Sequence, residues 1–245
     1  MDGENETGAH PHQAAALKAY LNGHFNAHEA ALAMTKSRAF EFVSEKKTDL
    51  RDRILGIIQD ALVELPERHT RPLIALLMEL AQLPDKVDGY PVWKNLSKTF
   101  GDSKSDAWKE AHWRQALETQ TRDPAARQRI REKLVHLAFV EASCAVAGVL
   151  PLDWGYECIS DALECHGAVR DFEVPVAAVW MEIAGRRLMQ GATEAERSWA
   201  LEREGRLWAA GPMSLDRWNF WIERLDELKK IDGVCISDLS IMRSV

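Results

Sequence analysis

Apolar residues recur along most of the chain at intervals of three and four positions, the spacing of one face of an α-helix. No stretch alternates apolar and polar residues for long enough to indicate a strand. Proline and glycine residues divide the pattern into segments. We therefore predict an all-α fold of about ten helices, over residues 13–23, 27–45, 49–65, 70–83, 105–119, 124–149, 153–166, 174–190, 194–210 and 214–230.

Several of these segments begin with residues that cap the free N–H groups of a helix. Asn26 with Glu29, and Thr193 with Glu196, have the capping-box spacing, in which each side chain accepts a hydrogen bond from a backbone N–H near the other. Asp123 precedes a proline, and Ser214 precedes an acidic first turn. The positions of these residues support the predicted helix starts.

The domain organisation follows from composition along the chain. Residues 1–12 contain glycine, proline and three acids, which predicts a flexible tail. Residues 13–245 are predicted to form one compact all-helical domain. The segment 84–104 holds two prolines and two glycines, so it is either a domain boundary or an ordered crossover with a short helix around 92–100. No repeat of 33 to 45 residues is present, which favours an irregular helical array.

Two segments, 124–149 and 214–230, are predicted to define the core. The second half of 124–149 is apolar on almost every side, as in a central helix that others enclose. The segment 174–190 places small residues among large ones, which permits close helix packing. The segment 214–230 carries its apolar residues on one face, namely Leu215, Trp218, Trp221, Ile222, Leu225 and Leu228.

Composition places the chain among soluble globular proteins. It has 245 residues, 46% hydrophobic and 28% charged, and tryptophan supplies 9 of the aromatic residues against 7 phenylalanines and 3 tyrosines. A net charge of −7 opposes binding to nucleic acid or to an anionic membrane. No segment offers the ~20 apolar residues that cross a bilayer. Residues 1–13 lack the features of a secretory signal, so we expect a cytoplasmic or nuclear protein with reduced cysteines.

Groups that could carry metal or thiol chemistry are sparse. Cys158 and Cys165 share a helical face, but a metal site would need a second pair, so we interpret them as buried and inert. His24 and His28 flank a turn and are not expected to share a face. His136 lies in an apolar helix and is interpreted as a hydrogen-bonded core residue. The sequence predicts neither a metal nor a cofactor.

Charged runs and short motifs also point away from a recognisable catalytic site. Asp153, Glu157, Asp161 and Glu164 recur at helical spacing and are interpreted as a solvated acidic face. The basic stretch 122–133 is interpreted as a solvated helix face, with a nucleic-acid contact as its alternative. Phosphate-binding loops and the nucleophile-elbow motif are absent from the sequence. We predict no catalytic residue.

Three strings in the second half of the chain resemble a known family. They are Val174 to Leu188, Leu207-Trp208 with Gly211-Pro212, and Ser214 to Leu225. They are similar to a family of all-helical proteins of filamentous fungi that is described only as a domain of unknown function. The resemblance covers roughly residues 50–244, is strongest over 174–228, and extends loosely to a tryptophan-leucine motif at Val92 to Leu96. It implies a fungal intracellular helical protein from variable accessory gene regions, and it assigns no catalytic residue.

The leading functional hypothesis is a non-catalytic helical scaffold that acts through a protein partner, because a well-specified core occurs without a catalytic motif. Exposure of Trp199 or Trp208 would favour it. The alternative is a ligand-binding or enzyme-like accessory protein of fungal secondary metabolism, with an apolar pocket lined by tryptophans. The candidate ligand-binding or interaction residues are Trp180, Glu182, Arg186, Arg217, Trp218 and Trp221.

Overall fold

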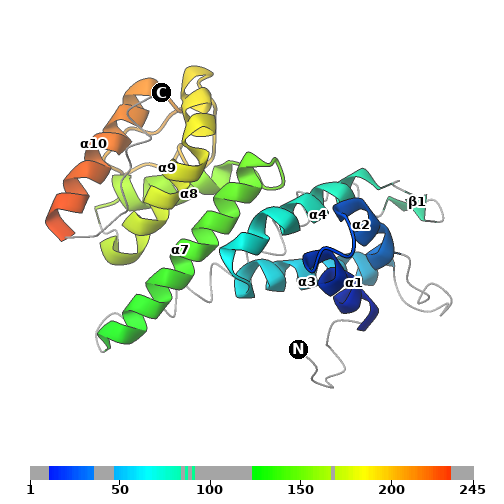
Figure 1. Ribbon diagram of the computed structural model, residues 1–245. Coiled ribbons are helices and arrows are strands. Elements are labelled where there is room, and N and C mark those ends of the chain that lie inside the picture. Colours follow the sequence, from blue (N-terminus) through cyan, green and yellow to red (C-terminus); the bar gives the residue numbers. More distant parts are fainter. Residues whose placement is uncertain are drawn as a thin grey trace. The chain divides into compact units, whose positions relative to one another are not determined.

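The computed structural model describes residues 11–35, 47–83, 86–87, 90–91, 123–166 and 169–232. Within these residues the secondary structure is almost entirely helical, which confirms the predicted all-α class (Figure 1). The predicted helix over 105–119 and the short helix around 92–100 lie outside the described residues, as do residues 1–10 of the predicted tail.

Eight α-helices and one short 3₁₀ helix are present in the described part of the chain, labelled as in Figure 1. They are α1 (Pro11–Leu21), α2 (Ala27–Thr35), α3 (Lys47–Glu64), η2 (Glu67–His69), α4 (Thr70–Gln82), α7 (Pro124–Val146), α8 (Asp153–Glu164), α9 (Arg170–Thr193) and α10 (Leu215–Asp232). Two short strands, β1 (Lys86–Val87) and β2 (Tyr90–Pro91), pair antiparallel. The helices therefore set the architecture.

The chain divides into two compact units, residues 1–100 and 101–245. The division falls inside the segment 84–104, where the sequence indicates either a boundary or a crossover. In the first unit, α2 packs against α1 and α4, and α3 also contacts α4. The amphipathic α4 supplies a face of buried leucines, and the hydroxyl of Tyr20 in α1 donates a hydrogen bond to the carbonyl oxygen of Pro72 in α4 over 2.8 Å.

Local capping follows the sequence prediction at three of the four helix starts. In α2 the side chain of Asn26 accepts from Glu29 N–H at 2.9 Å, and the side chain of Glu29 accepts from Asn26 N–H at 2.9 Å. Asp123 accepts from the N–H of Ala125 at the start of α7. Ser214 accepts a 3.1 Å hydrogen bond from Arg217 N–H at the start of α10.

Helix α9 is the central helix of the second unit, where it packs against α7, α8 and α10. Eleven residues of α9 are buried, against five of α7. The prediction that 124–149 is the enclosed central helix is therefore wrong. The prediction assumed that every apolar residue of this segment is buried. Some of them lie at the surface, and Val146 is 55% exposed.

Helix α9 also begins four residues earlier than the sequence predicts, and Pro175 lies inside it. Proline suits the first turn of a helix, but Pro175 is the sixth residue of α9. In the structure the carboxylate of Glu173 accepts a 2.6 Å hydrogen bond from the N–H of Val169, the residue just before the helix. This bond stabilises a first turn that begins before the proline. The helix therefore tolerates the loss of the one backbone hydrogen bond that Pro175 cannot donate.

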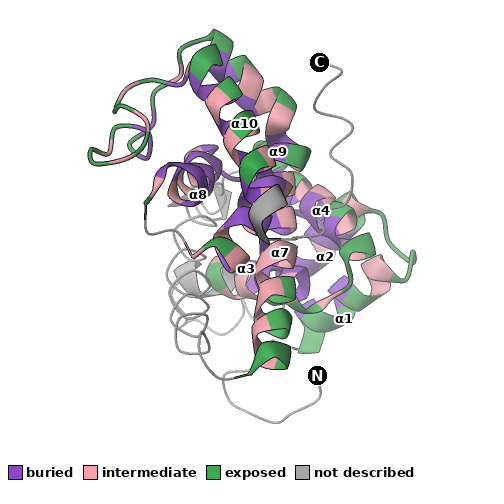
Figure 2. Cartoon of the chain, turned by 90° about the vertical axis from the view of Figure 1, so that its left-hand side faces the viewer, coloured by how far each residue is buried: buried purple, intermediate pink, exposed green. Residues whose placement is uncertain are grey.

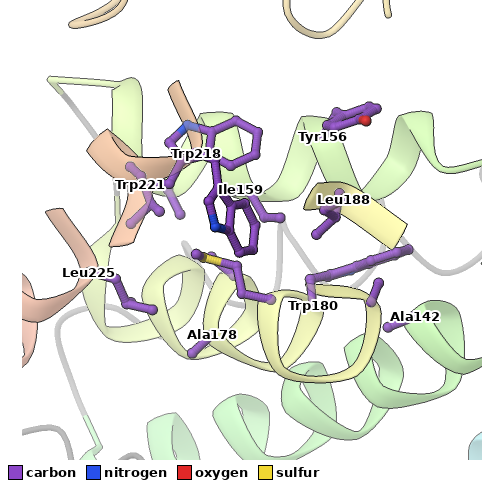
Figure 3. Packing of buried hydrophobic residues seen from close by; sticks show 14 of the residues in the cluster. Ala142, Tyr156, Ile159, Ala178, Trp180, Leu188, Trp218, Trp221 and Leu225 are labelled. Atoms are coloured by element: carbon purple, nitrogen blue, oxygen red, sulfur yellow. The ribbon is translucent and has the colours of Figure 1, made fainter. Parts of the chain in front are cut away.

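The core of the second unit is built from tryptophans that fit against small residues of neighbouring helices. Trp180 and Trp221 are fully buried and Trp218 is 6% exposed (Figure 3). A Cβ atom on Gly155 of α8 would lie only 2.7 Å from the ring of Trp180, so the absence of a side chain there makes room for the indole. Four of the six residues predicted for the buried face of 214–230 are buried, namely Trp218, Trp221, Leu225 and Leu228, whereas Ile222 is half-buried and Leu215 is exposed.

Candidate functional site

Residues 194–214, here called the α9–α10 loop, contain no regular helix or strand. The predicted helix over 194–210 is therefore wrong. Helix α9 ends at Thr193, and the N–H of Glu196 donates to the carbonyl of Gly191 over 2.9 Å, with Ala195 in the left-handed conformation (φ 52°). This is the Schellman arrangement that terminates a helix. The predicted capping box is also wrong, because the hydroxyl of Thr193 donates back to the carbonyl of Met189.

A fully buried ion pair lies beneath this loop. The Nε and Nη2 atoms of Arg217, in the first turn of α10, donate to Oε1 and Oε2 of Glu164, the last residue of α8, each over 2.8 Å. Both side chains are 0% exposed. The Nε1 atom of Trp221 donates a third hydrogen bond to the same carboxylate over 2.7 Å. A buried charge needs such compensation, since an unpaired one costs several kcal/mol.

Arg217 also binds the backbone of the α9–α10 loop through hydrogen bonds. Its Nη1 atom donates to the carbonyl oxygens of Leu201 at 3.2 Å and Gly211 at 3.1 Å. The backbone carbonyl of Glu164 accepts from Leu207 N–H at 2.8 Å. Arg217 therefore fixes two points of the loop backbone and the carbonyl of Glu164 fixes a third, while the ion pair joins α8 to α10.

A second polar cluster anchors the beginning of the loop. The carboxylate of Glu196 accepts from Arg187 of α9 at 2.9 and 3.2 Å, and from the hydroxyl of Tyr156 of α8 at 3.1 Å. Burial, followed by the charge of Glu196, raises the pKa of Tyr156 above its usual range, so the phenol stays protonated. The hydrogen bond with Glu196 raises the pKa of Arg187. The cluster is therefore a structural clamp between a cation, an anion and a neutral phenol.

Acidic residues of α8 provide a third set of anchors. Asp153 accepts from the hydroxyl of Ser198, Glu157 accepts from Arg203 at 2.8 Å, and Asp161 accepts from both Arg203 and Arg206. The interpretation of the acidic run as a solvated face is wrong. Glu164 is fully buried, and the other three acids bind the α9–α10 loop. That interpretation did not include a basic partner, which the loop provides through Arg203 and Arg206.

Many residues of the loop are exposed although its backbone is anchored (Figure 2). Trp199 is 52% exposed and Leu207 is 39% exposed. The guanidinium of Arg203 lies 4.5 Å from the centroid of the Trp199 ring, within range of a cation–π interaction. Trp208 is less exposed, because its ring packs against Phe220 of α10 with centroids 5.2 Å apart.

The structure separates the six candidate residues of the sequence into three environments. Trp180, Trp218 and Trp221 lie in the hydrophobic core. Arg217 lies in the buried ion pair with Glu164. Glu182 and Arg186 are exposed on α9. The six do not converge on one cavity.

Cys158 lies on α8, Cys165 follows that helix in extended backbone, and both are half-buried, so the prediction of two buried cysteines on one helical face is wrong. Burial is the main cause of the raised pKa of the Cys165 thiol, with acidic neighbours adding to it and Arg206 opposing it, so the reactive thiolate is disfavoured. The Nδ1 atom of His28 lies 3.0 Å from Glu79, and His24 lies in the turn after α1. Among the described residues there is no cluster of three or more His, Cys, Asp or Glu side chains that could hold a metal ion.

The predicted basic stretch begins outside the described residues and continues along α7. Arg127 forms an ion pair with Asp171 and lies 5.0 Å from the ring centroid of Phe172. Arg129 is mostly exposed and lies 3.9 Å from Asp123. In the part of the chain that the structure describes, no helix is long and apolar enough to span a membrane.

Sequence reasoning named Glu164 and Glu196 but gave each the wrong role, and it did not select Tyr156, Arg187, Arg203 or Arg206. One signal was present for Glu164. It lies four residues after Ser160 and eight after Tyr156 on α8, which is the spacing of one helical face, and both of these residues are buried. An acid on an apolar face implies a basic partner elsewhere in the chain. Glu196 gave no such signal, because it lies in the irregular loop.

One comparison with known proteins gives a match. A family model described as a protein of unknown function (DUF3632) matches residues 56–225, from within α3 to within α10. No curated protein and no solved structure matches. The matched range includes both members of the buried ion pair and the whole α9–α10 loop. Since the model covers more than half of the chain, the protein belongs to this family of unknown function.

Proposed function

We propose that the protein is a non-catalytic helical scaffold that binds a protein partner through the α9–α10 loop. The observation that carries this proposal is Trp199, which is 52% exposed on a loop whose backbone is anchored at several points. Irregular connections of this length are uncommon in compact domains and usually serve a function. A loop that is already ordered loses less conformational entropy on binding.

The side chains around Trp199 match those that dominate protein interfaces. Tryptophan and arginine are the residue types most enriched among interface hot spots. Arg203, which stacks on Trp199, is also held by Glu157 at 2.8 Å and by Asp161 at 3.0 Å. Its position is therefore fixed before a partner arrives. Trp199 and Arg203 together offer a flat apolar ring beside a positive charge, which suits a partner with an apolar or acidic contact.

The proposal is tested by quantitative affinity capture from a native extract, followed by direct binding measurements with each recovered protein. Three forms of the chain are compared, namely the wild type, Trp199→Ala and Leu215→Ala. Leu215 is the matched control because it is also apolar and 50% exposed, but it lies on α10. We expect Trp199→Ala to lose a partner that the other two forms retain, with at least about a tenfold rise in Kd.

A result in which all three forms recover the same proteins with equal affinity would remove the loop from the interface. Recovery of no reproducible partner by the wild type would reject the scaffold proposal itself. Circular dichroism of Trp199→Ala checks that the loss does not reflect unfolding. A substitution at such an exposed position is expected to change the stability by less than about 1 kcal/mol.

The cellular setting of the proposal rests on the sequence resemblance. That resemblance supports a fungal, intracellular protein of an accessory process encoded in a variable gene region. A fluorescent fusion tests the cytoplasmic or nuclear location, and the identity of the neighbouring genes tests the accessory setting. A signal from the cell wall or medium would contradict an intracellular role.

The alternative, an accessory protein of secondary metabolism with a tryptophan-lined pocket, stays a prediction. Trp180, Trp218 and Trp221 belong to the packed core, and this placement does not favour a pocket between them. A nucleic-acid role for the basic stretch also stays a prediction, and measurements of binding to DNA or RNA at low salt would test it.

A further inference from the structure

A pocket of about 110 Å³ lies between α7, α8 and α9. Its described lining does not include Trp180, Trp218 or Trp221, the tryptophans predicted from the sequence as ligand-binding candidates. Leu134 and Leu137 of α7, Trp154 of α8, and Phe172 and Val176 of α9 form its apolar wall. Trp154 and Val176 are half-buried, so they present apolar surface to the pocket. Apolar pockets with a few polar groups are typical of ligand sites between helices.

The polar part of the lining is acidic. Glu141, Asp161 and Glu173 contribute carboxyl groups, and none of the described residues that line the pocket is a lysine or arginine. Asp161 is already paired with Arg203 and Arg206. Glu173 uses Oε2 to accept from the N–H of Val169, and its Oε1 has no hydrogen-bond partner within the described residues. An acceptor is thus available beside an apolar wall.

We propose that this pocket binds a small organic ammonium ion, whose apolar body contacts Trp154 and Phe172 and whose N–H groups donate to Glu173. Hydrogen bonds between an ammonium and a carboxylate are about twice as strong as neutral ones. The aromatic walls also favour a cation over a neutral or anionic group. This inference is independent of the proposed protein partner, because the lining residues are not those of the exposed loop surface.

The volume limits what can enter. A cavity of about 150 Å³ accepts benzene, with six heavy atoms, so a pocket of about 110 Å³ accepts about four or five heavy atoms. The n-butylammonium ion has that size and is the probe of choice. Butanol has the same number of heavy atoms without a charge, and butyrate carries the opposite charge. These three probes separate apolar filling from charge recognition.

The test is an NMR titration of the full-length protein with each probe at constant ionic strength. We expect butylammonium to shift resonances from α7, α8 and α9, and to bind at least about tenfold more tightly than butanol, while butyrate gives no saturable shift. Equal binding of butylammonium and butanol, or shifts elsewhere in the chain only, would overturn the proposal.

Two substitutions on α9 make the test specific. Glu173→Gln keeps an oxygen that can accept from Val169 N–H but removes the negative charge, so we expect about a tenfold weaker affinity for butylammonium and no change for butanol. Glu182→Gln is the matched control, since Glu182 is exposed on the same helix and outside the pocket lining. Equal affinities in the two variants would contradict the proposal. A third variant, Val176→Phe, fills the pocket and should weaken both probes.

The pH dependence of butylammonium affinity is a further test, because a purely structural role of Glu173 would not change it. The pKa of Glu173 is raised to about 7, mainly by burial and also by the charge of Asp161, while the Val169 N–H and Arg206 oppose the rise. Glu141 lines the same pocket. Butylammonium should therefore bind more tightly as pH rises through 7, whereas Glu173→Gln should lose this dependence. A profile unchanged by the substitution would place the cation elsewhere.

A further arm distinguishes the two sources of such a group, a free amine and a lysine side chain of another protein. Acetyl-lysine-amide, blocked at the α-amino and carboxyl groups with a free ε-ammonium, carries the same four-carbon ammonium arm on a larger body. Weaker binding than butylammonium indicates a free amine as the ligand. Equal or tighter binding indicates a protein lysine, and failure of both compounds to bind overturns the proposal.

Discussion

The guanidinium of Arg217 and the carboxylate of Glu164 form two parallel 2.8 Å hydrogen bonds, although the two residues lie 53 positions apart in the chain. Neither side chain reaches solvent. Removing both charges from water is costly, so the pair persists only because hydrogen bonds compensate it. Trp221 and two loop carbonyls supply part of this compensation, which couples the ion pair to the loop conformation.

Removal of one partner should therefore destabilise the protein more than removal of both. We expect Arg217→Ala or Glu164→Ala to lower the free energy of unfolding by about 3–5 kcal/mol, because each leaves a buried charge unpaired. The double substitution Arg217→Met with Glu164→Leu should cost less than either. Urea denaturation followed by circular dichroism measures these differences.

A surface ion pair on the same helix is the matched control. Arg224 and Glu227 lie 2.9 Å apart on α10, and the side chain of Glu227 is 60% exposed. Glu227→Ala should change the free energy of unfolding by about 1 kcal/mol or less. A similar cost for Glu227→Ala and Glu164→Ala would show that the buried pair has no special contribution.

Most features that depend on near neighbours in the sequence were predicted well, apart from the capping box of Thr193 and Glu196, and features that depend on distant contacts were not. The capping box of Asn26 and Glu29 needs only three residues of spacing, and it is present. The apolar face of α10 needs only helical periodicity. The roles of Glu164 and Glu196 depend on partners in other elements, so periodicity cannot reveal them.

The α9–α10 loop shows why helical spacing alone was insufficient. Residues 194–210 include good helix formers, but the backbone of this segment bonds to Glu164 and to Arg217, and its own internal bonds, such as Leu201 N–H to the carbonyl of Ser198, form turns and not a continuous helix. Trp199 therefore lies on an anchored irregular segment, and its exposure had to come from the structure. Propensity is a weak prior that tertiary contacts override.

Gly191 provides a prediction in which helix propensity gives the wrong sign. A Cβ atom at this position would lie 2.2 Å from the hydroxyl oxygen of Tyr156 and 2.5 Å from Oε2 of Glu196. Alanine normally stabilises a helix interior relative to glycine by about 0.5–1 kcal/mol. We expect Gly191→Ala instead to destabilise the protein, by about 1–3 kcal/mol, because the methyl group displaces this buried cluster.

Gly185 is the control on the same helix. A Cβ atom there would lie 3.7 Å from the ring of Trp218, an ordinary contact, so Gly185→Ala should be neutral or stabilising. The combination of Gly191→Ala with Tyr156→Phe tests the cause, since loss of the hydroxyl should relieve part of the clash. Strict additivity of the two changes in thermal denaturation would contradict this mechanism.

Ala195 should be improvable by substitution. It has φ 52°, in the left-handed region, at the position of the Schellman motif where glycine is usual. The left-handed conformation costs an alanine roughly 1–2 kcal/mol. Ala195→Gly should therefore raise the free energy of unfolding by about 1 kcal/mol. Ala147 follows α7 with φ −77°, so Ala147→Gly should give no gain, and a gain of equal size there would reject the explanation.

Glu173 makes the stability of the protein depend on pH. Burial raises the pKa of its carboxyl group from 4.5 to about 7, so between these values the folded state retains a proton that the unfolded state has released. Stability therefore falls as pH rises from about 4.5 to about 7. Glu173→Gln removes the titration, so the variant should match the wild type near pH 4 and exceed it by about 1–2 kcal/mol above pH 7, allowing for partial solvent access.

Urea denaturation of both forms between pH 4 and pH 8 measures this difference. Glu182→Gln is again the control, since Glu182 is exposed on α9 and its substitution should leave the difference from the wild type independent of pH. A stability difference between Glu173→Gln and the wild type that stays constant over this range would show that Glu173 does not titrate with a raised pKa. With butylammonium present, the difference in stability between Glu173→Gln and the wild type above pH 7 should become smaller, because the bound cation stabilises the ionised carboxylate of the wild type.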